Sequence, residues 1–119
     1  MANGAMIISW GNSVRGREMK GLEVFGKALA FYDDLAKQGR IHGHREFFSL
    51  TGNATERAGT MVVEGDLAEL LKLQTEDENQ RLLDQAGLIC ENFTVQICRA
   101  ADDEAVGQYV SVLQELGLG

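Results

Sequence analysis

The chain has 119 residues, and its 11 basic and 18 acidic side chains give a formal net charge of −7. Apolar residues make up 45% and charged residues 24%, a composition typical of one globular domain and unlike that of a disordered segment. The acidic balance argues against nucleic acid as a partner, because phosphate binding needs a basic face. No apolar run approaches the ~18 residues of a membrane-spanning helix, so no membrane association is expected.

The sequence predicts a single domain over residues 1–119, with residues 1–5 as a disordered tail and no secretory signal. Two cysteines, Cys90 and Cys98, are too few for a disulfide scaffold. Both fall in a segment that the sequence predicts to be one strand, which would hold them about 26 Å apart, beyond the ~7 Å that a disulfide allows. We therefore expect free thiols and a cytoplasmic protein.

The first half of the chain predicts a strand, a long helix and a hairpin. Residues 6–10 form a short apolar run that stops at Gly11, which is typical of a strand. Strands are also predicted over residues 41–50 and 59–64, and the short polar link between them implies an antiparallel hairpin. Residues 16–38 carry apolar side chains at helical spacing, which predicts a buried stripe of Met19, Leu22, Phe25, Leu29, Tyr32 and Leu35.

The second half predicts two short helices, a strand and a final helix. The short helices cover residues 67–73 and 76–86, and Gly87 is expected to end the second one. A strand follows over residues 88–99. The last helix covers residues 102–116, with an apolar stripe of Val106, Tyr109, Val110, Leu113 and Leu116.

The order of these elements predicts an α+β, ferredoxin-like βαββαβ fold with an extra C-terminal helix. One four-stranded antiparallel sheet with helices on one face satisfies that order. The other face of the sheet must then be polar or be buried by a partner. A symmetric homodimer, joined through the sheet faces around a partly polar cavity, supplies a second sheet most simply.

Three stretches of the chain resemble the dimeric α/β-barrel superfamily. They are residues 15–25, residues 39–41 and residues 81–86. The chain is similar to an uncharacterised bacterial group near the YCII-related and antibiotic-biosynthesis-monooxygenase-like proteins. This resemblance implies that two ferredoxin-like subunits close their sheets into one barrel. The matching stretches are structural, so the resemblance implies no particular activity. Haem-binding relatives place their ligating histidine on a helix, whereas both histidines here fall in a predicted strand, so we expect no cofactor.

The segment His42-x-His44-x-Glu46 is the sharpest candidate for catalysis. Residues two apart in a strand point the same way, so all three side chains would line one face. Two imidazoles and a carboxylate could transfer protons near neutral pH, and the same trio could ligate a divalent metal, although we expect no metal. The alternative is a polar strand surface in which Glu46 simply pairs with an arginine.

Five further residues are candidates for contact with a small organic or anionic ligand. Trp10 could stack on a planar molecule as a wall of the barrel cavity. Arg15 and Arg17 precede a predicted helix, where anions are attracted. Arg45 and Gln96 belong to strands that would face the same cavity. Residues 1–63 carry eight basic and six acidic side chains, so this half of the chain is the place to expect an anion.

Three functions remain open on the sequence alone. The first is a homodimeric α/β-barrel protein that binds a small organic molecule between its sheets. The second is a cofactor-free monooxygenase or isomerase-type enzyme that uses His42, His44 or Glu46. The third is a structural or interaction module whose barrel is filled with side chains.

Overall fold

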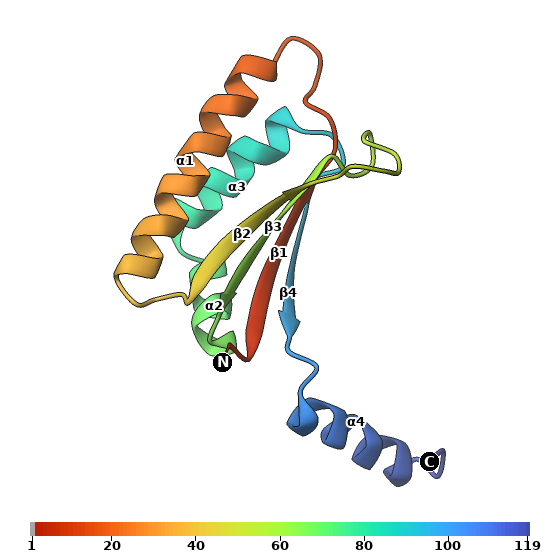
Figure 1. Ribbon diagram of the computed structural model, residues 1–119. Coiled ribbons are helices and arrows are strands. Elements are labelled where there is room, and N and C mark those ends of the chain that lie inside the picture. The colour runs from red at the N-terminus through yellow and green to blue at the C-terminus, as the bar shows by residue number, and fades with distance from the viewer. Residues whose placement is uncertain (1) are drawn as a thin grey trace.

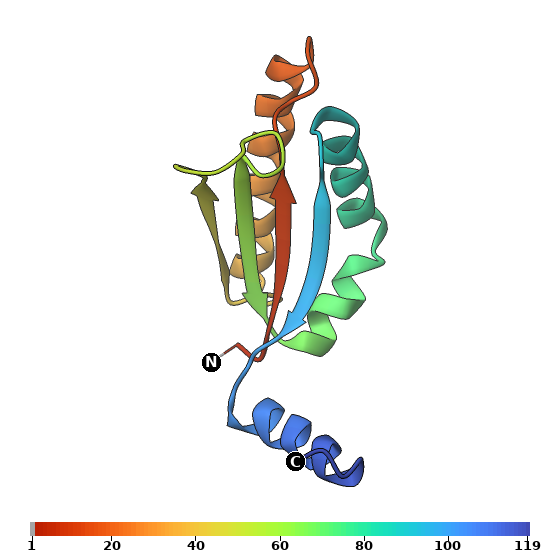
Figure 2. The same ribbon diagram turned by 90° about the vertical axis from the view of Figure 1, so that its right-hand side faces the viewer.

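The computed structural model describes residues 2–119 and contains one four-stranded antiparallel sheet. The strands are β1 (Gly4–Trp10), β2 (Gly43–Phe48), β3 (Gly59–Gly65) and β4 (Thr94–Arg99), and they lie side by side in the order β2-β3-β1-β4 (Figure 2). Helical connections lead from β1 to β2 and from β3 to β4, whereas β2 and β3 form a hairpin. The predicted α+β ferredoxin-like fold is confirmed.

Three of the four helices cover the same face of the sheet, and the fourth does not (Figure 1). These three are α1 (Glu18–Lys37), α2 (Leu67–Gln74) and α3 (Asp77–Ile89). The last helix, α4 (Asp103–Glu115), has no buried residue and stands clear of the sheet. It is the extra C-terminal helix that the sequence predicts, but among residues 2–119 nothing buries its apolar stripe.

Alternation along the strands separates a buried face from an uncovered one. Met6 and Ile8 of β1 and Met61 and Val63 of β3 point toward the helices and are at most 5% exposed. Because successive strand residues point to opposite faces, their neighbours form the uncovered side, which we call the open face. From the register of the strands, the open face consists of Ala5, Ile7, Ser9, Gly43, Arg45, Phe47, Thr60, Val62, Glu64, Thr94, Gln96 and Cys98.

The predicted strand over residues 88–99 is wrong in its first half. Helix α3 continues through Gly87 to Ile89, and β4 begins only at Thr94. The chain reverses at Asn92, which has a left-handed φ of 52°. Cys90 therefore lies at the end of a helix and not in a strand. Both cysteines are free, as predicted. The predicted separation of about 26 Å along one strand is not the reason, because only Cys98 lies in a strand.

Other boundaries shift for physical reasons that the sequence pattern does not reveal. Strand β1 begins at Gly4, and the side chain of Asn3 accepts a hydrogen bond from the Leu67 amide at 2.7 Å, so much of the expected tail is ordered. Met19 and Leu22 are 78% and 66% exposed, because the first turns of α1 extend beyond the end of the sheet (Figure 1). Across residues 2–119, no helix is both long enough and apolar enough to cross a membrane.

Candidate functional site

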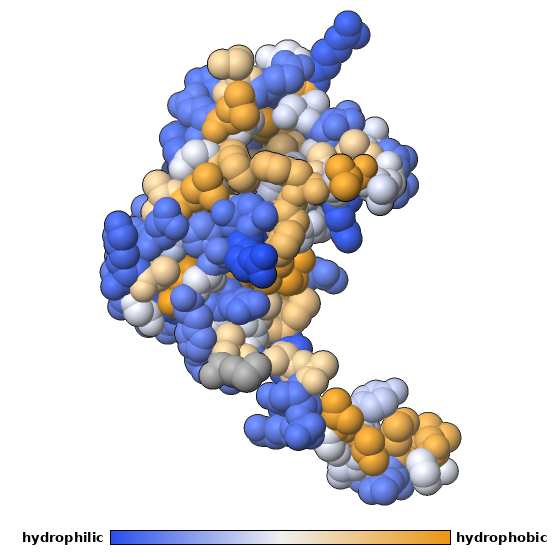
Figure 3. All heavy atoms as spheres, in the orientation of Figure 1, coloured by the Kyte–Doolittle hydropathy of each residue, from blue (hydrophilic) through white to orange (hydrophobic). Residues whose placement is uncertain are grey.

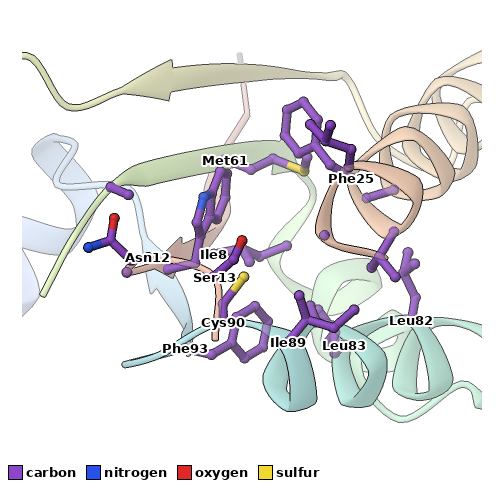
Figure 4. A pocket seen from close by; sticks show the side chains of 18 of the residues that line it. Ile8, Asn12, Ser13, Phe25, Met61, Leu82, Leu83, Ile89, Cys90 and Phe93 are labelled. Carbon is purple, nitrogen blue, oxygen red and sulfur yellow. The ribbon is translucent and has the colours of Figure 1, made fainter. Parts of the chain in front are cut away.

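An apolar pocket of about 380 Å³ lies between α1, α3 and the end of the sheet where β1 stops (Figure 4). Aromatic side chains form much of its wall, and the other side chains on it are mainly aliphatic. The aromatic members come from four parts of the chain: Trp10, Phe25, Tyr32, Phe48 and Phe93. A concave, aromatic-lined space of this size is typical of sites that bind small organic molecules.

The residues next to Trp10 in the sheet and on α1 explain how the aromatic side chains of the pocket wall pack together. Trp10 is the last residue of β1 and pairs with Gly59 of β3. The absence of a side chain at Gly59 leaves room for the indole, because a Cβ there would lie 2.4 Å from Trp10 Cζ2. The ring centroid of Phe25 on α1 lies 5.8 Å from that of Trp10 and 5.9 Å from that of Phe48, distances typical of packed aromatic pairs.

One buried polar pair lies at the inner end of the site. Tyr32 lines the pocket, and its hydroxyl donates a 2.6 Å hydrogen bond to Asn79 Oδ1 on α3. Both residues are fully buried, and burial raises the pKa of the Tyr32 phenol above its ordinary value, so the hydroxyl stays protonated. Within residues 2–119, the Asn79 amide nitrogen has no hydrogen-bond partner. This pair ties α1 to α3 beneath the pocket.

The other polar side chains on the pocket wall are those of Asn12, Ser13, Glu18 and Cys90. Glu18 accepts a hydrogen bond of 2.9 Å from the Gly16 amide, which holds the pKa of this carboxyl below its ordinary value. Burial raises the pKa of the Cys90 thiol, so the thiol is protonated at neutral pH and is a poor nucleophile. The pocket thus offers a negative charge at one side and no activated nucleophile on its wall.

His44 is held between two carboxylates outside this pocket. Its Nε2 lies 2.6 Å from Asp33 Oδ1 on α1, and its Nδ1 lies 2.7 Å from Glu46 Oε2 on β2. Burial lowers the pKa of the imidazole, but the hydrogen bonds and charges of the two carboxylates outweigh burial and leave it above its ordinary value. With both nitrogens occupied, the ring fastens β2 to α1.

The three candidate catalytic residues do not line one face, which corrects the expectation from the sequence. His44 and Glu46 point toward the helices, whereas His42 precedes β2, is exposed and lies near Ala5 and Cys98 of the open face. The alternation breaks because Ile41 enters the core, where it is 2% exposed. Among residues 2–119, no group of three His, Cys, Asp or Glu side chains could hold a metal ion.

The five candidate ligand-binding residues are also dispersed. Trp10 lies on the helix-covered side and not in a cavity between sheets, whereas Arg45 and Gln96 lie on the open face. Arg15 is exposed in the loop before α1, and Arg17 donates a hydrogen bond to the Leu88 carbonyl oxygen. The strand register separates these residues, so the structure does not assemble them into one site.

Sequence reasoning missed most of the pocket wall. It placed Phe25 and Tyr32 in a core stripe and Phe93 in a strand, and it assigned no role to Phe48. One sequence signal could have indicated the pocket. Each of the two facing helices has an alanine on the pocket wall, Ala28 on α1 and Ala86 on α3. Because neither side chain reaches across, the space between the helices stays open.

Comparison with known proteins supports the fold. No family model and no curated protein matches the chain. A dimeric protein of unknown function with a ferredoxin-like fold from Bacteroides fragilis matches with a TM-score of 0.59 at 12% identity, over 82% of this chain and 95% of that one. A dimeric ferredoxin-like protein of unknown function from Jannaschia sp. matches with a TM-score of 0.63 at 14% identity, over 82% and 98%.

A third solved structure with the same architecture is an enzyme. The hydroxynitrile lyase from Passiflora edulis matches with a TM-score of 0.57 at 7% identity, over 86% of this chain and 97% of that one. At these identities the likeness concerns the fold alone. The chain is therefore an α+β protein of ferredoxin-like architecture. Its matches extend over nearly the whole length of each of the three neighbours.

Proposed function

We propose that the protein is a homodimer that binds a small, uncharged and mainly apolar organic molecule in the pocket between α1 and α3. The observation that carries this proposal is the aromatic-lined space of about 380 Å³ beside Trp10. Burying an apolar molecule there removes its surface, and that of the aromatic walls, from water. This location replaces the cavity between sheets that the sequence favoured, because Trp10 points to the helix-covered side.

Charge selects an uncharged ligand over an anionic one. Glu18 is an exposed residue at the pocket and carries a negative charge near neutral pH, as any carboxyl of ordinary or lowered pKa does. Arg15, Arg17 and Arg45, the expected anion contacts, are not on the pocket wall. An anionic molecule would therefore meet repulsion without a compensating cation.

The proposal is binding and not catalysis. A monooxygenase or isomerase that uses His44 or Glu46 needs a free proton-accepting atom near the substrate, but both His44 nitrogens contact carboxylates. The grouping near YCII-related or monooxygenase-like bacterial proteins rests on the sequence resemblance alone, and a cytoplasmic location stays a prediction. A purely structural module is the outcome that a failed binding experiment would favour.

The open face supports the homodimer. Ile7 and Val62 lie at its centre and are only half-buried in one chain. A second copy could cover these side chains by placing its own open face against them. The ferredoxin-like neighbours from Bacteroides fragilis and Jannaschia sp. are described as dimeric, which agrees with this proposal.

Titration with the neutral fluorescent probe N-phenyl-1-naphthylamine tests the pocket. Ala28 lies on the pocket wall, so Ala28→Phe should fill the space and weaken probe binding at least tenfold. Ala30→Phe places the same side chain on the exposed side of the same helix and should bind like the unmodified chain. Equal binding by both variants, at equal thermal stability, would refute the pocket as the site. The anionic analogue 8-anilinonaphthalene-1-sulfonate should bind more weakly than the neutral probe.

A further inference from the structure

Helix α4 carries an apolar stripe that no other part of the described chain, residues 2–119, covers. Tyr109 is 66% exposed, Leu116 is 68% exposed and Val106 is 52% exposed, and no residue of the helix is buried. Figure 3 shows hydrophobic residues on the surface of this helix, which stands apart from the rest of the molecule. An isolated helix of 13 residues is only marginally stable in water, so its order requires a packing surface.

Contacts at its first turns hold α4 away from its own sheet. Arg99, the last residue of β4, donates a hydrogen bond to the Gln108 side chain and lies 3.8 Å from Glu104. The linker is short, and the Ala100 amide donates a 2.9 Å hydrogen bond to the Asn3 carbonyl oxygen. For α4 to fold back over its own open face, these contacts would have to break. The covering surface is therefore expected on another molecule.

A surface of matching chemistry lies at the far end of β2. We call it the β2 tip and define it as Arg45, Phe47, Leu50 and Arg57, the last two on the loop that joins β2 to β3. Phe47 and Leu50 are 46% and 97% exposed. Within residues 2–119, neither Arg45 nor Arg57 forms an ion pair. The β2 tip is thus apolar and basic, with Glu56 as the one acidic neighbour in the loop.

The charges of α4 complement this surface. The helix and its N-cap contain Asp102, Asp103, Glu104 and Glu115 and no basic residue. The apolar stripe of α4 is flanked by acidic side chains, whereas the apolar side chains of the β2 tip are flanked by basic ones. Complementary potentials of this kind favour one docking orientation over others and speed encounter.

We propose that α4 packs on the β2 tip of a second copy of this chain. The inference rests on the proposed homodimer and adds the arm that would hold it together. From the end of β4, α4 extends toward the side of the sheet that the helices leave open (Figure 1). A second copy seated on the open face would lie within reach of α4. Two-fold symmetry then makes the contact twice, once by each helix.

Disulfide trapping between two different chains tests this contact directly. Both chains carry Cys90→Ser and Cys98→Ser, one carries Tyr109→Cys, and the other carries Leu50→Cys and a mass tag. Mixing and mild oxidation should give a covalent heterodimer of about twice the 13.0 kDa mass of one chain. The matched control replaces Leu50→Cys by Asp84→Cys, on an exposed site of α3, and should give no covalent heterodimer.

The outcomes separate this inference from the proposed function. A dimer in light scattering without the Tyr109–Leu50 cross-link, or with equal cross-linking to position 84, overturns the role of α4 and leaves the pocket proposal intact. A monomer in light scattering overturns both the homodimer and this inference. Failure of the unmodified protein to bind the probe, when the trapping chains do form the cross-link, overturns the pocket alone.

A substitution in α4 gives an independent readout. Tyr109→Ser removes the largest side chain of the stripe and should raise the dimer dissociation constant at least tenfold. Ser111→Ala lies outside the stripe and should leave the dissociation constant unchanged. Arg57→Glu should weaken the dimer as well, and more strongly at low salt than at high salt, because salt screens the charges. Unchanged dissociation constants for Tyr109→Ser and Arg57→Glu would contradict the proposal.

Discussion

Gly11 is the residue at which three parts of the backbone meet. Its amide donates a 2.7 Å hydrogen bond to the Glu91 carbonyl oxygen. A Cβ at this position would lie 1.9 Å from the Thr55 carbonyl oxygen and 2.8 Å from that of Glu91. Both close atoms belong to the backbone, so no side-chain rotation could relieve the contact. The end of β1 can approach the other two loops only because residue 11 is glycine.

We predict that Gly11→Ala lowers the free energy of unfolding by about 2–3 kcal/mol, the usual cost of overpacking. Gly26→Ala is the matched control, because no atom lies within 4 Å of its added Cβ and Gly26 is inside α1. That control should stabilise the protein by about 0.5–1 kcal/mol through helix propensity. Urea unfolding measures both, and equal stability of the two variants would contradict the close approach at Gly11.

The two carboxylates beside His44 make folding stability depend on pH. Folding raises the pKa of this imidazole, so the folded chain holds the proton more tightly than the unfolded chain. The contribution is fully present below the unfolded pKa near 6.5 and is lost as pH rises through the folded value. The unmodified protein should therefore lose part of its stability as the pH rises above about 6.5.

His44→Gln should remove this component and cost about 1–2 kcal/mol at pH 6, where the charged hydrogen bonds are present. Its stability between pH 6 and pH 8 should change less than that of the unmodified protein. His42→Gln alters the exposed histidine that contacts neither carboxylate and should keep the original profile. A profile for His44→Gln as steep as the original would show that another group titrates.

At the scale of elements, the sequence pattern predicted the four helices, although Gly87 does not end α3 as expected. Asp66 and Asp102 cap two of these helices, and each accepts a hydrogen bond from the amide three residues ahead, at 3.1 Å and 2.9 Å. Residues 88–93 were predicted wrongly, because a short apolar run fits both the end of a helix and the start of a strand. Tertiary packing decides between them, and Ile89 is 9% exposed in the core at the end of α3.

The pocket could not be predicted because it depends on register and packing. A single break in alternation, at Ile41, decides that His44 points to α1 and His42 does not. The wall of the pocket combines Trp10 with side chains far along the chain, such as Phe93. The spacing of residues along the sequence does not reveal which distant side chains come into contact in the fold. It did predict the uncovered sheet face, because that follows from the order of elements alone.

The N-cap of α2 offers a prediction at this scale. Asp66→Ala removes the acceptor for the Glu69 amide and should cost about 1 kcal/mol of stability. Asp84→Ala removes the same charge from an exposed position in the middle of α3 and should stay within about 0.5 kcal/mol of the unmodified protein. Thermal unfolding of both variants at one pH separates the cap from the charge. A loss of equal size in both would assign the effect to net charge.

At the scale of the whole molecule, one chain leaves two apolar surfaces uncovered. One is the open face around Ile7 and Val62, and the other is the stripe of α4 around Tyr109. Contiguous apolar surface of this kind marks an interface in soluble proteins. Since a second copy could cover both at once, the proposed homodimer would account for them with a single partner.

Ile7→Lys tests the central part of that interface. Ile7 lies on β1 between Val62 of β3 and Gln96 of β4, so a lysine there would put charge in the middle of the open face. In a two-fold dimer this change introduces two ammonium groups into the interface, and the cost of removing them from water should shift the protein to monomers at micromolar concentration. Sedimentation velocity should then give the 13.0 kDa mass of one chain.

Ile7→Val is the control, because it shortens the same side chain without adding charge and should remain dimeric. The lysine variant should keep the unfolding cooperativity of one intact domain, since the open face is not part of the helix-covered core. Its pocket lies on the opposite side of the sheet and should still bind N-phenyl-1-naphthylamine. A lysine variant that stays dimeric would show that the copies meet elsewhere, and the arm formed by α4 would then be the first contact to test.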